Sequence, residues 1–173
     1  MITFTISGID KTIKELQDYA TSLPVKLKTL VETLMYEGWD IAAAGFANAL
    51  YAGTKDVTLD VPQWQDNTMY LVAHGEHVAF IEFGSGVTYE EYPADVLPEG
   101  VVEHGKYGKG QGANPPWVYV GDAGDLGYTL AKKKDGRSVV RTYGNPPARA
   151  MYDASKVLDK EHIEQVAKEI FNG

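Results

Sequence analysis

His74, Glu76 and His77 are the side chains whose types and spacing come nearest to a catalytic site. Two histidines three residues apart can approach one metal ion, but a site needs a third ligand and supporting hydrogen bonds. The helical His-Glu-x-x-His pattern of metalloproteases is absent. The spacing therefore favours two solvated histidines in a turn, and a metal-dependent hydrolase that uses His74, Glu76 and His77 stays as an alternative function.

Glu82 and Arg149 are the charged residues with the most unusual surroundings. Glu82 lies in the apolar run 78–83, where a buried acid with a raised pKa would be typical of a general acid. In a strand Phe80 and Glu82 would share one face, which favours an edge charge or a subunit contact. Arg149 falls in the first turn of an expected helix, where the dipole disfavours a cation. It is either the partner of a carboxylate such as Glu82 or a plain surface arginine.

The remaining nucleophile and phosphate motifs are incomplete. Gly84-Ser85-Gly86 is not the Gly-x-Ser-x-Gly elbow of hydrolases. The glycine-rich tract 105–112 lacks both the Gly-Lys-Ser/Thr ending and the following helix of a phosphate-binding loop. There is no cysteine, so thiolate metal sites and disulfides are excluded. We therefore expect no catalytic residue, no cofactor and no metal.

The bulk composition is that of one globular domain. The chain has 173 residues, 44% of them hydrophobic, and a net charge of −8. That charge argues against a sequence-reading DNA-binding protein, although an acidic wall suits DNA that passes without sticking. The start of the sequence does not resemble a signal peptide, and no apolar run approaches the ~20 residues that span a bilayer. We expect no membrane, and a place in the cytoplasm or in a particle assembled there.

Hydrophobic periodicity predicts an α+β fold in which a small antiparallel sheet packs against a long N-terminal helix and C-terminal helices. Ile9, Ile13, Leu16, Ala20 and Leu23 recur at helical spacing, and Pro24 is placed as the first residue of a second helix. The expected elements are strand 2–6, helices 10–23 and 24–51, strands 57–61, 67–73 and 78–83, helix 147–158 and a last helix around 163–171. Residues 74–77 are expected to form a hairpin turn.

A long excursion separates the two halves of this expected core. The single domain 1–173 would have a core of residues 1–86 and 143–173, with an arm at about 87–142. Strands at 117–120 and 138–143, joined through Asp135-Gly136, would make the arm two-stranded. Aromatic residues in the arm are of the kind enriched at interfaces. The candidate subunit-interface residues are Glu82, Phe83, Tyr89, Tyr92, Trp117, Tyr119 and Arg149.

Two stretches carry a family resemblance. Phe-Ile-Glu-Phe-Gly-Ser-Gly at 80–86, then a variable tract, then Asn-Pro-Pro-Ala-Arg-Ala-Met-Tyr at 145–152 resemble the HK97 gp10-like family of tailed-bacteriophage proteins. Ser85 replaces the family's usual threonine, and Ala150-Met151 replaces proline-phenylalanine. The order of the N-terminal elements is also similar, so the resemblance covers nearly the whole chain.

The resemblance implies a virion structural protein of the neck, the head–tail connector. Such proteins, also labelled minor capsid or tail-completion proteins, join head and tail as ring-forming subunits without catalysis. The implied partners are further copies of the chain, in a ring that can form only on docking, together with connector or head-closure proteins and tail-terminator or tail-tube proteins. Genome DNA would pass nearby without specific binding. A small regulatory binding module remains a further alternative.

Overall fold

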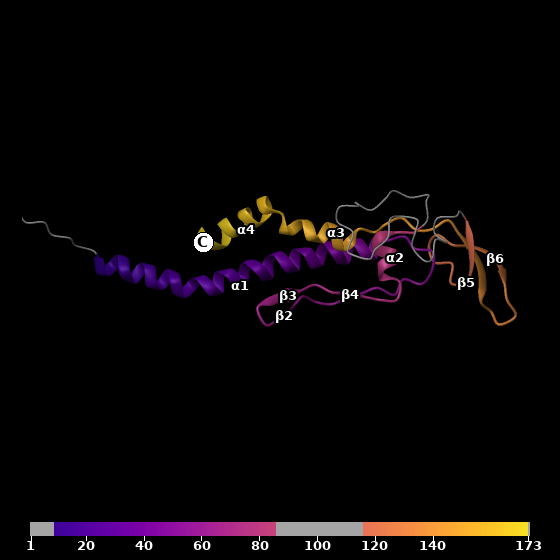
Figure 1. Cartoon of the computed structure of the whole chain (residues 1–173), viewed down its shortest axis with the longest axis horizontal. Helices are drawn as coiled ribbons and strands as arrows, with labels where there is room; N and C mark the ends of the chain where they lie inside the picture. Colours follow the sequence, from indigo (N-terminus) through magenta and orange to yellow (C-terminus); the bar gives the residue numbers. More distant parts are fainter. Residues whose placement is uncertain (1–8, 86–115, 173) are drawn as a thin grey trace, which may run out of the picture.

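A long N-terminal helix forms the axis of the molecule, as the computed structural model shows (Figure 1). The structure describes residues 9–85 and 116–172. The helix, α1, runs from Ile9 to Asn48, and its 40 residues span about 60 Å. Smaller helices and a hairpin pack along its C-terminal half, and a small sheet closes that end (Figure 1). The architecture is α+β, as the sequence predicts.

Helix α1 continues through Pro24, so the prediction of two separate helices is wrong. In the turn before the proline, the hydroxyl groups of Thr21 and Ser22 donate hydrogen bonds to the carbonyls of Gln17 and Tyr19, both at 2.8 Å. The helix also changes direction within its N-terminal half (Figure 1). A bend at a proline is the usual way for a helix to tolerate the ring and the missing N–H.

A long antiparallel hairpin follows α1, and its pairing differs from the prediction. It is built from β1 (Thr58–Leu59) paired with β4 (Ala73–His74), and β2 (Gln63–Gln65) paired with β3 (Thr68–Tyr70). The turn lies at Asp66 and Asn67, where Asp66 has φ 55°. Near the turn, Trp64 Nε1 donates to Glu32 Oε1 of α1 at 2.9 Å. The strand around 67–73 thus pairs backwards with 58–65, not forwards with 78–83.

The run Val78–Phe83 is a short helix, α2, and the prediction of a strand there is wrong. A short apolar run cannot be assigned to helix or strand by periodicity alone. The deciding contact is distant in sequence, because Asp56 accepts the N–H of Glu76 at 2.8 Å and that of His77 at 3.2 Å. Those two bonds bend residues 74–77 into the start of α2, where a hairpin turn was expected.

The described part of the excursion forms a three-stranded antiparallel sheet of order β5-β7-β6. Its strands are β5 (Trp117–Gly121), β6 (Tyr128–Lys132) and β7 (Ser138–Thr142), so β6 was missed by the sequence reading. Val140 of β7 is fully buried, and the N–H of Asp125 donates to the carbonyl of Tyr51 at 2.8 Å. This sheet therefore packs onto the core. Residues 117–142 of the expected arm are thus held against the rest of the chain.

Three helical segments at the C-terminus pack on α1. They are α3 (Ala150–Ser155), the 3-10 helix η3 (Lys156–Leu158) and α4 (Lys160–Asn172). Helix α3 begins three residues after Pro147, later than predicted. No helix among the described residues is long and apolar enough to cross a membrane.

Glycines of α1 allow α3 to approach closely. A Cβ on Gly45 would lie 2.7 Å from Ala150 Cβ and 2.9 Å from its Cα, whereas one on Gly38 would lie 3.4 Å from the carbonyl oxygen of Ala154. Nearby, Phe46, Ala49, Tyr51, Ile81 and Ala150 form the buried core cluster. The α1–α3 contact therefore depends on a residue without a side chain, glycine, at position 45.

Gly45→Ala should lower the free energy of unfolding by roughly 1–3 kcal/mol, because the new methyl group overlaps backbone atoms of α3. Gly38→Ala is the matched control, and its better helix propensity should leave stability unchanged or raise it by up to about 1 kcal/mol. Urea unfolding followed by circular dichroism measures both. Equal effects of the two substitutions would contradict the close α1–α3 packing.

Candidate functional site

The two stretches that carry the family resemblance meet in space. We call residues 81–85 together with 145–152 the clasp. Ser85 and Asn145 exchange two backbone hydrogen bonds, each 2.9 Å long, as an isolated antiparallel bridge. The N–H of Ala148 donates to the carbonyl of Ile81 at 2.8 Å, and the N–H of Arg149 to that of Glu82 at 3.2 Å. Segments about sixty residues apart in the chain are thus joined by backbone pairing.

The carboxylate of Glu82 caps helix α3. Its Oε2 accepts the N–H of Met151 at 3.1 Å, and its Oε1 accepts the N–H of Tyr152 at 3.0 Å. These are N–H groups of the first helical turn, which have no partner inside a helix. Arg149, the residue before α3, has φ 55° and makes no side-chain cap. Glu82 supplies from α2 the negative charge that a helix N-terminus favours.

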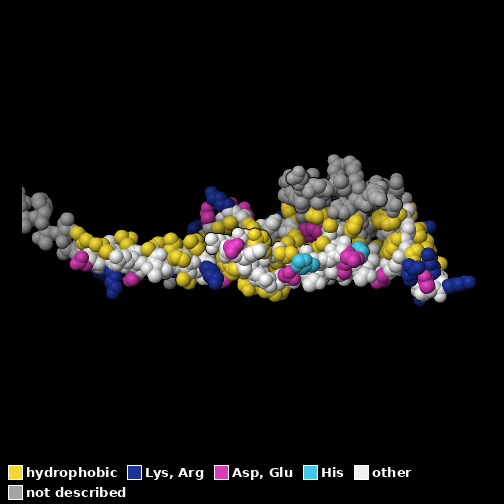
Figure 2. Space-filling model, turned by 60° about the horizontal axis from the view of Figure 1, so that its bottom comes forward, with side chains coloured by type: hydrophobic (Ala, Val, Ile, Leu, Met, Phe, Trp, Pro, Cys, Tyr) yellow, Lys and Arg dark blue, Asp and Glu magenta, His cyan; other side chains and the backbone are white. Residues whose placement is uncertain are grey.

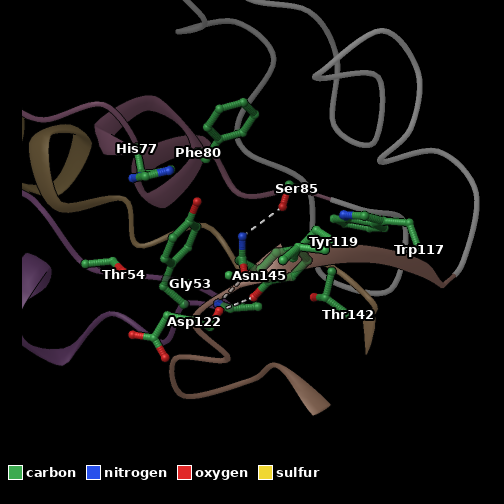
Figure 3. Close-up of a pocket in the computed structure, with 14 residues that line it drawn as sticks. Gly53, Thr54, His77, Phe80, Ser85, Trp117, Tyr119, Asp122, Thr142 and Asn145 are labelled. Atoms are coloured by element: carbon green, nitrogen blue, oxygen red, sulfur yellow. Dashed lines mark hydrogen bonds between the residues drawn. The ribbon is translucent and has the colours of Figure 1, made fainter. Parts of the chain in front are cut away.

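Gly84 and Asn145 complete the clasp. Gly84 has φ 75°, and a Cβ there would lie 2.8 Å from Pro147 N, so only glycine fits without strain. Asn145 Oδ1 accepts the N–H of Ala52 at 2.7 Å, while Nδ2 donates to Ser85 Oγ at 2.9 Å (Figure 3). The buried Asn145 amide therefore ties the segment that follows α1 to both segments of the clasp. Because Ser85 Oγ faces an amide donor, it has no base there to remove its proton.

A cavity of about 420 Å³ lies beside the clasp, between α2 and strand β5 (Figure 3). Aromatic rings form much of its wall: Tyr51, Phe80, Trp117 and Tyr119. Burial, with smaller contributions from nearby Tyr119 and Asp56, raises the pKa of Tyr51 to about 12. The Tyr51 hydroxyl is therefore neutral at physiological pH, so this aromatic part of the wall carries no charge, although Asp122 and His77 also line the cavity.

The two histidines of the alternative metal site face different aspartates. His74 Nε2 lies 2.7 Å from Asp60 Oδ2, and His77 Nδ1 lies 3.2 Å from Asp56 Oδ1. Burial acts to raise the pKa of Asp56, but hydrogen bonds from Glu76 and His77 outweigh it and lower that pKa. Within the described ranges, no group of three or more His, Asp or Glu side chains is placed to hold a metal ion. The structure thus does not bring His74, Glu76 and His77 together as a ligand set.

The predicted interface residues fall in different environments. Glu82 is only 5% exposed and is bonded within its own chain, so its place is that of a capping residue and not of an edge charge. Phe83 and Arg149 are half-buried in the clasp, and Trp117 and Tyr119 are half-buried in the cavity wall. Tyr89 and Tyr92, like strand 2–6, lie outside the described residues. Sequence reasoning missed the roles of Asp56 and Asn145, because neither has a local signal for its distant partner.

The N-terminal half of α1 presents a second surface, which we call the α1 stripe: Ile9, Ile13, Leu16, Ala20 and Leu23. Ile9, Ile13 and Leu16 are 49%, 47% and 64% exposed. Figure 2 shows apolar side chains along one edge of this projecting part of the helix and charged ones along the opposite edge. Apolar side chains at helical spacing normally face a packing partner.

Comparison of the chain with protein-family models, with curated proteins and with solved structures gives no match.

Glu82→Ala should lower the free energy of unfolding by roughly 2–3 kcal/mol, because hydrogen bonds to a charged group are lost from the start of α3. Glu82→Gln keeps one acceptor oxygen and should cost less. Asp153→Asn, an exposed acid in the first turn of the same helix, is the control and should change stability by under about 0.5 kcal/mol. Denaturant unfolding compares the three, and a Glu82→Ala loss as small as that of Asp153→Asn would refute the cap.

The raised pKa of Tyr51 predicts a loss of stability in alkali. The unfolded chain ionises Tyr51 near its ordinary pKa of 10.0, whereas the folded chain holds the proton until about 12. Stability is thus fully present below pH 10 and falls by roughly 2–3 kcal/mol as the pH rises towards 12. Urea unfolding of wild type and of Tyr51→Phe between pH 8 and 12 should show a difference that shrinks across this window. A constant difference would contradict the assignment.

Proposed function

We propose that this chain is a structural subunit of the neck of a tailed bacteriophage, where it helps to complete or join head and tail as a member of a ring. The observation that carries the proposal is the clasp. The residues on which the resemblance to the HK97 gp10-like family rests are the same residues that bind one another in the structure. The resemblance therefore rests on residues that contact one another in the fold.

Each distinctive residue type in the two stretches has a packing reason. Gly84 is required by its positive φ and by the closeness of Pro147. Glu82 is required as the cap of α3, and Ala150 has to be small because it touches Gly45. A proline at 147 has no N–H to donate to the facing segment, and it precedes the start of α3. A pattern explained by mutual support is typical of a scaffold whose functional surfaces lie elsewhere.

The shape and the charge also support an assembly role. The molecule is elongated, and the N-terminal half of α1 projects beyond the rest of the described chain with an exposed apolar edge (Figures 1 and 2). An exposed apolar stripe along a helix is typical of a surface that packs against a partner. Ring subunits need such surfaces, since head-to-tail contacts close into rings when the rotation permits. The net charge of −8 suits a subunit past which DNA slides without specific binding.

The polar groups around the cavity are used to hold the chain together. The Asn145 amide bonds Ala52 and Ser85, and Asp56 bonds the start of α2. The Tyr119 hydroxyl donates to the carbonyl of Asp122. These bonds support a structural use of the region, with head-closure or connector proteins on one side of the ring and tail-terminator or tail-tube proteins on the other as partners.

A phage that encodes this chain, with a stop codon early in the reading frame, should make filled heads and complete tails that stay apart. Electron microscopy and plaque counts of such lysates measure the effect. Wild-type protein supplied from a plasmid should restore joined, infectious particles, and so should the Asp153→Asn control, whose change lies on the exposed side of α3. Normal joined particles in the absence of the protein would overturn the proposal.

A further inference from the structure

The face of α1 that is bare in its N-terminal half is the face that its own chain covers further on. Gly38 and Gly45, where α3 and η3 approach most closely, follow the α1 stripe at helical spacing, and Leu34 on the same face is 5% exposed. The same face of α1 is thus covered in the C-terminal half of the helix and exposed in the N-terminal half. The exposed part is a continuation of an established helix–helix interface.

Helix α4 stops partway along this surface. It runs antiparallel to α1, since His162 Nε2 lies 2.7 Å from Glu37 Oε2 while Lys26 Nζ donates to the carbonyl of Phe171 at 3.1 Å. Its last described residue is Asn172, so its described part ends near Lys26. From there α1 continues back to Ile9, about 25 Å, with no described element packed on the α1 stripe.

The spacing of the exposed residues is that of a coiled-coil seam. The stripe positions 9, 13, 16, 20 and 23 alternate in steps of four and three, an average of 3.5 residues, and the same alternation continues through Leu27, Leu30 and Leu34. A repeat of 3.5 keeps one seam facing a partner helix over many turns. The geometry therefore fits a second helix lying alongside.

The charges around the stripe favour another copy of this chain over a membrane. Residues 9–27 contain three lysines and three acidic residues and are neutral overall, although the whole chain carries −8. Two such segments can approach without net repulsion. A membrane-surface helix, by contrast, is rich in Lys and Arg on its polar face. A projecting helix of about 15 residues is also only marginally stable in water by itself, so it gains from burying its apolar side.

We propose that residues 9–23 of α1 pack against the same residues of a second copy, apolar stripe to apolar stripe, so that two copies form a pair. Because each stripe meets only its counterpart, this contact is self-complementary and differs from the head-to-tail contacts that close a ring. This pairing goes beyond the function proposed above and does not depend on it. Leu16 lies at the middle of the stripe, so it meets its counterpart whether the two helices run parallel or antiparallel. Asp18 is exposed on the opposite side of the helix.

Single cysteines test this contact in the full chain, which has no cysteine of its own. Leu16→Cys should give a disulfide-linked dimer on mild oxidation in clear excess over Asp18→Cys, as measured on non-reducing gels. The average mass of the wild type in light scattering should rise with concentration, and Leu16→Asp should remove that rise. Circular dichroism checks that all three variants keep the helix content of the wild type.

Equal cross-linking of the two cysteine variants, or the same dependence of mass on concentration for the wild type and Leu16→Asp, would overturn the contact. The outcome is separable from that of the neck proposal. A protein located at the head–tail junction without stripe cross-linking would refute only this contact. Specific cross-linking of a protein that phage assembly does not need would support this contact and refute the neck proposal.

Discussion

The carboxylate of Glu82 at the start of α3 is the contact on which the rest of the fold depends. It belongs to α2, whose own start is fixed by Asp56, and it caps a helix that begins nearly seventy residues later. Through α3 it reaches α1, because Ala150 lies against Gly45 where no side chain intervenes. A buried carboxylate is costly unless its oxygens are hydrogen-bonded, so this arrangement is stable only when all three helices are in place.

The consequence is a well-packed centre from which the N-terminal half of α1 projects. The clasp and the Asn145 amide hold α1, α2 and the β5-β7-β6 sheet in register around an aromatic cavity. Away from that centre, α1 projects with an apolar edge that its own described chain does not cover (Figure 2). A packed centre with a projecting helix that exposes an apolar face suits a subunit that contacts its neighbours in a defined geometry.

The sequence predicts the local parts of this structure better than the distant ones. The apolar period of α1 and α4 and the turn chemistry at Asp135-Gly136 are local, and those elements were found. Residues 78–83 were taken for a strand because the bonds that make them helical come from Asp56, which no neighbouring residue reveals. Pro24 was interpreted as a helix boundary because a proline removes a hydrogen bond from the helix at that residue. The continuity of the helix face on both sides of Pro24 is not a local signal. Glu82 was recognised as unusual, but its partners could not be read from sequence spacing.

The central claim is that this chain is a fixed component of a virion neck. Immunogold labelling of purified particles, with peptide quantification of the same preparation by mass spectrometry, tests it most directly. The account predicts label at the head–tail junction only and a constant number of copies per particle that is consistent with a ring. Particles that lack the protein, or that carry it in variable amounts away from the junction, would contradict the account.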